Sequence, residues 1–243
     1  MTDATERTRI ALIGMGKMGR ALDELAESRG CIVVARLDAT AMAQPDLRAQ
    51  LGGADVAIDF TQPDAAVANT LALLAAQTAV VIGTTGWDAH RDEIAAAAHA
   101  SGRAALWSPN FSLGVQLFLA IAEEAGRRLR EVPAFDTRIL EVHHTAKRDA
   151  PSGTALAIQA RLAMGLSHAP EITSLRVGAV PGTHTIVCDA PFEQIDLTHE
   201  ARDRRVFADG ALSAARWLAR VDRPGLYTMQ DMLARTIAPP LEA

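Results

Sequence analysis

The chain contains 243 residues, of which 49% are hydrophobic and 22% are charged, and its formal net charge at pH 7 is −5. This composition supports a buried core and excludes a disordered chain, and the length allows one or two domains. An acidic balance and an aromatic content of only 4% argue against the basic, base-stacking surfaces of nucleic-acid-binding proteins.

We expect neither a targeting segment nor a membrane segment. The first nine residues are polar and mixed in charge, unlike a signal peptide, and no apolar run approaches the ~18 residues that a membrane helix needs. We therefore predict a soluble, cytoplasmic protein. Cys31 and Cys188 lie in apolar runs without Cys-x-x-Cys spacing, so each is predicted to be a buried, unreactive thiol. No Cys/His/Asp group has the spacing of metal ligands, and we expect no metal site.

Strands and helices alternate in the first half of the chain. Apolar runs predict strands at residues 9–14, 31–38, 55–61, 79–86 and 104–109. Helices are predicted at 18–28, from the turn at 61–64 to residue 77, and at 88–101, whereas the roughly 16 residues between the second and third strands show no clear helix. This run of βα units predicts an α/β domain with a Rossmann-like, doubly wound parallel sheet.

The pattern changes after a long predicted helix at residues 115–130. Strands are predicted at 136–144, 171–180, 183–190, 193–201 and 204–210, and one helix, at 154–165, interrupts them. Strands with few intervening helices indicate a second, α+β domain with an open, antiparallel or mixed sheet. The chain then continues with a helix at 210–219, a Pro-Gly turn at 224–225 and a short helix at 229–234.

A glycine-rich loop follows the first predicted strand. Gly14, Gly16 and Gly19 form Gly-x-Gly-x-x-Gly between a strand and a helix, which is the context in which this motif binds the pyrophosphate of a dinucleotide. The alternative is a plain strand–turn–helix. The predicted cofactor contacts in this loop are Gly14, Met15, Gly16, Lys17, Met18 and Gly19.

Asp38 ends the second predicted strand, where a carboxylate accepts hydrogen bonds from the adenosine ribose. Its charge repels a 2′-phosphate and favours NADH. Arg36, on the same strand face, and Lys17, in the phosphate loop, leave NADPH open.

Two further loops follow the fourth and fifth predicted strands, at the edge where doubly wound sheets bind ligands. Their small and hydroxylic residues suit close approach to a nicotinamide ribose, and an asparagine could bind the carboxamide. Ordinary turns are the alternative. The predicted contacts are Gly83, Thr84 and Thr85 in the first loop and Ser108, Pro109, Asn110 and Phe111 in the second.

Only two of the 24 basic residues are lysines, Lys17 and Lys147, and both lie in segments suited to chemistry. Lys147 follows the pair His143–His144 and, unlike arginine, can give up a proton, so these residues are candidate proton donors. A surface strand end is the alternative for the histidines. Both can join one site only if the strand ends there, because neighbouring strand residues face opposite sides.

The segment 152–154 precedes a predicted helix. Ser152 is a suitable N-cap, and the N–H groups at the start of the helix could hold a substrate carboxylate. A simple helix cap is the alternative reading of Ser152, Gly153 and Thr154. Asp149 could brace the loop or the lysine and is not expected to be catalytic.

The segment EVHHTAKRDAPSGTA, from Glu141 to Ala155, resembles the signature E-x-H-H-x-x-K-x-D-A-P-S-G-T-A of the dihydrodipicolinate reductase family of bacterial and plant lysine synthesis, without a gap. Other segments also resemble family segments in family order, so that the likeness covers most of the chain. These are residues 59–61, 82–86, 108–115, 176–184 and 207–218.

The resemblance implies an NAD(P)H-dependent oxidoreductase of diaminopimelate and lysine biosynthesis that reduces 4-hydroxy-tetrahydrodipicolinate to tetrahydrodipicolinate with loss of water. It implies a dinucleotide-binding domain (residues 1–113 plus 208–243) and a substrate-binding and tetramerisation domain (residues 114–207) in a homotetramer. His143 and Lys147 would transfer the proton. The substrate carboxylates would be bound by His144, Ser152, Gly153, Thr154 and Arg204.

Two departures from the family pattern stand out: the short segment between the second and third strands, and Ala39, where NADPH-tolerant relatives often have arginine. Two other functions stay open. One is another Rossmann imine or semialdehyde reductase, such as an aspartate dehydrogenase. The other is an NAD(H) sensor without enzymatic activity, although no DNA-binding module is evident.

Overall fold

The structure, a computed structural model, describes residues 7–237 and divides into two compact units. The first comprises the described residues up to Phe111 and those from Phe207 onward, and the second spans Ser112–Val206. The predicted dinucleotide-binding domain includes residues 1–6 and 238–243, which lie outside the described part. Among the described residues, no helix is both long and apolar enough to cross a membrane.

The first unit contains a six-stranded sheet in which every neighbouring pair is parallel, in the order β10-β5-β4-β3-β1-β2. The expected Rossmann-like fold is therefore confirmed. From β1 the chain adds β2 on one side and then returns to add β3 on the other, and ligands bind at such a reversal, beyond the carboxyl ends of the strands. The strands are β1 (Thr8–Ile13), β2 (Cys31–Leu37), β3 (Val56–Asp59), β4 (Ala79–Ile82), β5 (Ala104–Trp107) and β10 (Gly225–Thr228).

Helices connect these strands. Because helices cover both faces of such a sheet, its strands are apolar along their whole length. All residues of β3, β4 and β5 are buried. The helices of this unit are α1 (Lys17–Ala26), η1 (Glu27–Arg29), α2 (Ala39–Met42), α3 (Leu47–Gln50), α4 (Pro63–Ala75), η2 (Asp88–His90), α5 (Arg91–Ser101), α8 (Arg205–Leu218) and α9 (Met229–Ile237).

Two expectations for the first unit were incomplete. The segment between β2 and β3 holds two one-turn helices, α2 and α3, whose N-caps are the side chains of Asp38 and Asp46. One turn is too short to show a helical period. The Pro-Gly turn at residues 224–225 leads directly into β10, an edge strand of four residues that pairs with β5.

The predicted strand at residues 204–210 is wrong, because this segment begins the helix α8. The buried residues Ala208, Ala211, Ala215 and Leu218 recur at helical spacing. Gly210, where the predicted strand ended and the predicted helix began, lies inside α8 and allows it to pack closely, since a Cβ atom there would lie 1.7 Å from the backbone oxygen of Phe111.

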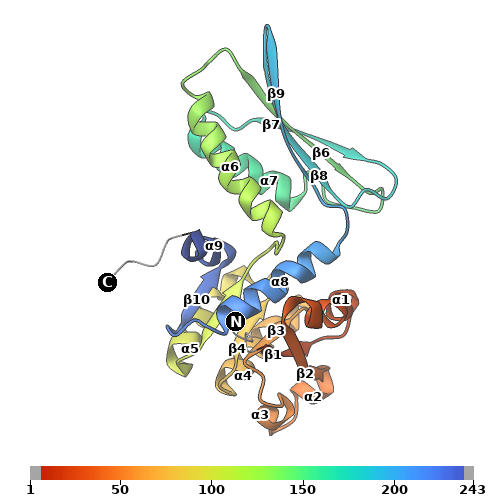
Figure 1. Cartoon of the computed structure of the whole chain (residues 1–243), viewed down its shortest axis with the longest axis vertical. Coiled ribbons are helices and arrows are strands. Elements are labelled where there is room, and N and C mark those ends of the chain that lie inside the picture. Colours follow the sequence, from red (N-terminus) through yellow and green to blue (C-terminus); the bar gives the residue numbers. More distant parts are fainter. Residues whose placement is uncertain (1–6, 238–243) are drawn as a thin grey trace, which may run out of the picture. The chain divides into compact units, whose positions relative to one another are not determined.

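The second unit pairs a four-stranded sheet with two helices, α6 (Leu113–Leu129) and α7 (Gly153–Gly165), which lie along one face of it (Figure 1). The sheet order is β7-β6-β8-β9, with β6 parallel to β7 and the other pairs antiparallel, so the expected mixed sheet is confirmed. The strands are β6 (Asp136–His143), β7 (Glu171–Arg176), β8 (Thr183–Ala190) and β9 (Glu193–Glu200).

Strand β6 changes character along its length. Its buried face carries Thr137 and Ile139 and then two ionisable residues, Glu141 and His143. Ile139 packs with Ile158 of α7 and Ile186 of β8 in the apolar core of the unit. Polar groups therefore replace the apolar core at the carboxyl end of β6, where the candidate site begins.

Candidate active site

The glycine loop after β1 fits an anionic group. Gly14 has φ +84°, and a Cβ atom at Gly19 would lie 2.1 Å from the backbone oxygen of Gly14, so neither position accepts a side chain without distortion. The N-cap of α1 is Gly16, which offers no capping side chain, and the first turn contains no acidic residue. The N–H groups at this helix start and its partial positive charge thus face the loop, as a dinucleotide pyrophosphate requires.

Asp38 lies exposed directly after β2 and accepts a hydrogen bond from the Ala41 backbone N–H at 2.9 Å. The nearby Arg36 is bound by Asp23 of α1, with N–O distances of 2.9 and 2.5 Å. Lys17, in the first turn of α1, is exposed. Arg36 and Lys17 are the two cations that could bind the 2′-phosphate of NADPH. Arg36 is already paired with a carboxylate.

A buried carboxylate joins the loops after β3 and β4. Asp59 is fully buried and accepts hydrogen bonds from Thr61 (N–H at 2.9 Å, hydroxyl at 2.6 Å), Asn69 (2.9 Å) and Thr84 (3.2 Å). Burial raises the pKa of the Asp59 carboxyl, against the lowering effect of these bonds. Thr84, a predicted cofactor residue, is therefore part of a polar anchor, whereas its neighbour Thr85 is exposed. Residues 59–61 were noted as a family segment, but no role was inferred for Asp59.

The loop after β5 is ordered by its own side chains. Ser108 donates a hydrogen bond to the Asn110 backbone oxygen at 2.7 Å and accepts one from the Asn110 N–H at 3.2 Å. Phe111 is buried and its ring lies 5.8 Å from that of Phe60, while Pro109 is exposed. All three predicted cofactor loops therefore lie at the carboxyl edge of the parallel sheet.

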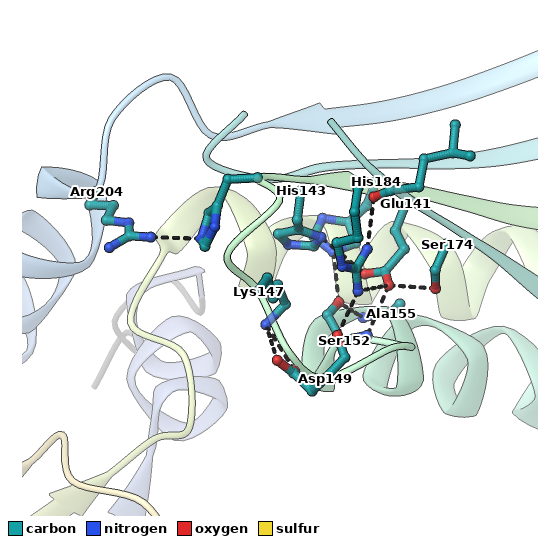
Figure 2. A network of polar contacts seen from close by, with 12 residues as sticks. Glu141, His143, Lys147, Asp149, Ser152, Ala155, Ser174, His184 and Arg204 are labelled. Atoms are coloured by element: carbon teal, nitrogen blue, oxygen red, sulfur yellow. Dashed lines mark hydrogen bonds and ion pairs between the residues drawn. The ribbon is translucent and has the colours of Figure 1, made fainter. Parts of the chain in front are cut away.

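In the second unit, Glu141 is the centre of a buried polar cluster (Figure 2). Its Oε1 accepts hydrogen bonds from the Ser152 backbone N–H (3.0 Å), the Ser174 hydroxyl (2.6 Å) and Arg176 (3.0 Å). Its Oε2 lies 3.2 Å from His143 Nδ1 and 3.8 Å from the Nε2 atom of His184. The two imidazole rings meet edge to face at 5.1 Å.

The protonation of this cluster follows from its contacts. Burial alone would raise the pKa of the Glu141 carboxyl, but the hydrogen bonds from Ser152, Ser174 and Arg176 lower it to about 2, so Glu141 is ionised at neutral pH. Burial lowers the pKa of His143, and the Glu141 charge opposes this effect. Burial and the neighbouring His143 lower the pKa of His184 to about 4.

The two adjacent histidines have different partners. Strand β6 ends at His143, which joins the buried cluster, whereas the Nε2 atom of the half-buried His144 lies 2.8 Å from Arg204. The predicted substrate-binding pair of His144 and Arg204 is therefore brought together. Lys147 donates to both carboxylate oxygens of Asp149 at 2.8 Å and keeps 22% of its side chain exposed. Asp149 thus holds the lysine.

Ser152 is both a helix cap and a member of the cluster. Its Oγ accepts from the Ala155 N–H at 3.1 Å as the N-cap of α7, and it lies 3.2 Å from His184 Nε2. Gly153 is exposed and Thr154 half-buried in the first turn of the helix. The reading of this segment as a helix cap is correct and compatible with ligand binding by the same turn.

Sequence reasoning assigned no role to four members of the cluster, Glu141, Ser174, Arg176 and His184. The strand register places Ser174 and His184 on either side of Glu141, and Arg176 beside His143. Glu141, His143 and His184 are spaced closely enough to bind a metal ion, which their spacing in the sequence did not indicate. The Arg176 cation already compensates the charge of Glu141.

Comparison with known families places nearly the whole described chain in one group. Residues 8–111 match the family model described as dihydrodipicolinate reductase, N-terminus. Residues 114–233 match the model described as dihydrodipicolinate reductase, C-terminus. The two matches meet close to the boundary between the structural units after Phe111.

Individual relatives give the same result. A 4-hydroxy-tetrahydrodipicolinate reductase of Rhodopseudomonas palustris (strain BisB18) is 38% identical and covers 90% of this chain and 94% of its own. A protein of the same name from Alkalilimnicola ehrlichii is 37% identical, over 93% and 98% of the two chains. A dipicolinate-bound dihydrodipicolinate reductase from Paenisporosarcina sp. TG-14 shares the fold, with a TM-score of 0.77, 23% identity and coverage of 91% and 97%.

Proposed function

Because the chain belongs to the dihydrodipicolinate reductase family, it is an NAD(P)H-dependent oxidoreductase of diaminopimelate and lysine biosynthesis, and we propose how its residues divide the work. The reaction reduces 4-hydroxy-tetrahydrodipicolinate to tetrahydrodipicolinate with loss of water. Family membership over both units carries this conclusion, and it removes the aspartate dehydrogenase and NAD(H)-sensor alternatives. The cytoplasmic location stays a prediction.

The proton-transfer pair is His143 and Lys147. When bound, the reduced nicotinamide supplies a hydride to C4 of the cyclic imine that the substrate forms on losing water. A proton must then reach the neighbouring carbon. His143 is buried beside an ionised carboxylate, and Lys147 carries an ammonium on a loop of the same unit. Both side chains are of the types that act as general acids in enzymes.

The substrate carboxylates are bound by cations and by a helix start. His144 and Arg204 lie in contact and form one binding group for a carboxylate. The guanidinium of Arg204 suits this role, since it binds carboxylates through paired hydrogen bonds. Ser152, Gly153 and Thr154 form the first turn of α7, whose partial positive charge favours an anion. A dianionic substrate thus finds positive groups in a protein whose net charge is −5.

The cofactor is assigned to the carboxyl edge of the first unit. The glycine loop and the start of α1 suit the pyrophosphate, and Asp38 suits the adenosine ribose. The loops after β4 and β5, anchored by Asp59 and by Ser108, suit the nicotinamide half. The contacts are those predicted from the sequence: Gly14, Met15, Gly16, Lys17, Met18, Gly19, Asp38, Gly83, Thr84, Thr85, Ser108, Pro109, Asn110 and Phe111.

NADH is the preferred cofactor in this proposal. Asp38 places a carboxylate at the end of β2, where a 2′-phosphate would be repelled, and Ala39 supplies no positive charge. Arg36 is held by both oxygens of Asp23, so using it for a phosphate would break that pair. Lys17 remains exposed and gives NADPH one favourable contact.

We also propose a homotetramer formed through the second unit. Helices α6 and α7 cover one face of its sheet (Figure 1). Strand alternation and register place Leu140, Val142, Leu175 and Val187 on the opposite face. Leu175 is 48% exposed in the single chain. Apolar residues on an open sheet face are typical of subunit contacts. Native mass spectrometry is expected to show four copies, and a Leu175→Glu variant is expected to give smaller species.

The activity is tested with freshly synthesised 4-hydroxy-tetrahydrodipicolinate, by following the loss of reduced-nicotinamide absorbance with NADH and with NADPH. We expect rapid oxidation of both and a higher kcat/KM for NADH. Folded protein that binds NADH but does not oxidise it when the substrate is added would contradict the function. Equal efficiencies with the two cofactors would contradict only the preference.

A further inference from the structure

Glu141 is an ionised group held firmly inside the second unit, and the proposed division of roles gives it no task. Its side chain is fully buried, and three donors, one at the start of α7 and two on β7, hold its Oε1 atom. With Oε1 fixed, the direction of Oε2 is fixed as well, and it faces the ring of His143 (Figure 2).

Two buried atoms at this point lack hydrogen-bond partners. Among the described residues, Glu141 Oε2 and His143 Nδ1 are both buried and without a partner, although they lie 3.2 Å apart. A buried polar atom left unpaired costs ~1–3 kcal/mol. A bond from His143 Nδ1–H to Glu141 Oε2 satisfies both atoms, and the charge of the carboxylate strengthens this bond when His143 is protonated.

We propose that Glu141 is a positioning residue for His143: it accepts the Nδ1 proton, fixes the ring and its tautomer, and leaves Nε2 as the atom that exchanges the proton. This inference rests on the proposed role of His143. In the donating step the Nε2–H bond breaks, the electron pair stays on Nε2, and the proton bonds to the carbon beside C4. The Nδ1–H bond is kept throughout, and Glu141 stabilises the imidazolium before transfer.

Gly182 supports the choice of Nε2. A Cβ atom at this position would lie 3.0 Å from His143 Nε2 and 3.3 Å from its Cδ2 atom. A side chain there would therefore press on the edge of the ring that must meet the substrate. Glycine keeps that edge uncovered while the opposite edge is held by Glu141.

The charges around the ring determine what removing Glu141 should do. Burial lowers the pKa of His143, and Lys147 and Arg176 lower it further, while Glu141 and Asp149 raise it. His184 contacts the ring edge to face. Glu141 is the anion in contact with the ring, so its neutralisation is expected to move the His143 pKa further down and reduce the imidazolium fraction at neutral pH.

The first test is a measurement on the unsubstituted protein, and a variant serves only to assign the signals. Nitrogen chemical shifts of His143, assigned by comparison with His143→Gln, report which ring atom carries the proton when the imidazole is neutral. We expect the proton on Nδ1 in the full-length protein. A neutral ring protonated on Nε2 would overturn the proposal.

The second test compares Glu141→Gln with Glu171→Gln, an exposed glutamate on the neighbouring strand β7. We expect Glu141→Gln to lower kcat by about 10- to 100-fold, as loss of a group that orients a functional histidine typically does. We also expect it to lower the His143 pKa in the NMR titration and to move the alkaline fall of kcat to lower pH. Glu171→Gln should change none of these.

The outcomes separate this inference from the proposed function. A Glu141→Gln enzyme with reduced kcat but an unshifted His143 pKa and pH profile would make Glu141 merely structural and refute the inference. If His143→Gln itself turns over normally, the assignment of His143 fails first. If both roles are correct, adding Glu141→Gln to the His143→Gln variant should lower kcat little further, because the effects of coupled residues are not additive.

Discussion

Lys147 carries a prediction at the scale of a single residue. It is one of two lysines in the chain and is held by both carboxylate oxygens of Asp149. Replacing it with alanine removes a proton donor, so we expect Lys147→Ala to lower kcat by roughly 10²–10⁴-fold. NADH binding should stay intact. Arg148→Ala removes an exposed neighbouring cation and is the control for a general loss of charge. Near-normal turnover in Lys147→Ala would remove this residue from the mechanism.

Asp38 carries the second prediction. We expect Asp38→Ala to weaken binding of NADH more than of NADPH, because the lost carboxylate both accepts from the ribose and repels a 2′-phosphate. Dissociation constants from fluorescence titration measure this difference. Asp38 also caps α2, so Asp46→Ala, which removes the equivalent cap of α3, is the matched control and should affect both cofactors equally. Equal losses in Asp38→Ala would refute the ribose role.

At the scale of the element, α8 depends on one glycine in its interior. A Cβ atom at Gly210 would lie 1.7 Å from the Phe111 backbone oxygen. We therefore expect Gly210→Ala to lower the free energy of unfolding by about 1–3 kcal/mol, the usual cost of overpacking, despite the better helix propensity of alanine. Thermal unfolding measures the loss. Ser213→Ala, at a half-buried position on the same helix, should change the Tm much less.

The elements that the sequence predicted correctly share a physical cause. Buried parallel strands such as β3, β4 and β5 are continuous apolar runs, and long helices such as α6 show a full apolar period. The errors lie where a local pattern is too short or a tertiary contact decides. One-turn helices and the four-residue strand β10 have no readable period. The strand-to-helix boundary predicted at Gly210 is wrong, because the contact of Gly210 with Phe111 is invisible in the sequence.

The candidate site divides in the same way. His143, His144, Lys147 and the turn at residues 152–154 are neighbours in the chain, so a local motif indicates them. Ser174, Arg176 and His184 are over 30 residues from Glu141. They reach it because β7 and β8 flank β6 in a particular register. Strand register depends on the packing of a whole face, and no short segment of sequence encodes it.

At the scale of the whole molecule, the two units should respond differently to acid. In the second unit, burial and the nearby His143 lower the folded-state pKa of His184 from 6.5 to about 4, and hydrogen bonds lower that of Glu141 from 4.5 to about 2. Both groups bind protons more weakly when folded, so the stability they contribute is present at neutral pH and lost on acidification. In the first unit, burial raises the pKa of Asp59, so acidification changes the contribution of Asp59 to stability in the opposite direction.

We therefore expect acid to loosen the second unit first. Between pH 6.5 and 4, hydrogen exchange, corrected for the intrinsic pH dependence of amide exchange, should lose protection in residues 112–206 before the first unit. His184→Gln removes the histidine that resists protonation and should flatten this response. An equal loss of protection in both units would contradict the prediction.

The strand β10 brings residues 225–228 beside β5, although the whole second unit, residues 112–206, separates the two in the chain. A ribosome makes the chain from its N-terminus, so the whole second unit is synthesised before the last strand of the first unit. The edge of β5 therefore waits unpaired throughout that interval. Translation that ends between residues 207 and 224 leaves a complete second unit joined to a nucleotide-binding sheet that still lacks its sixth strand.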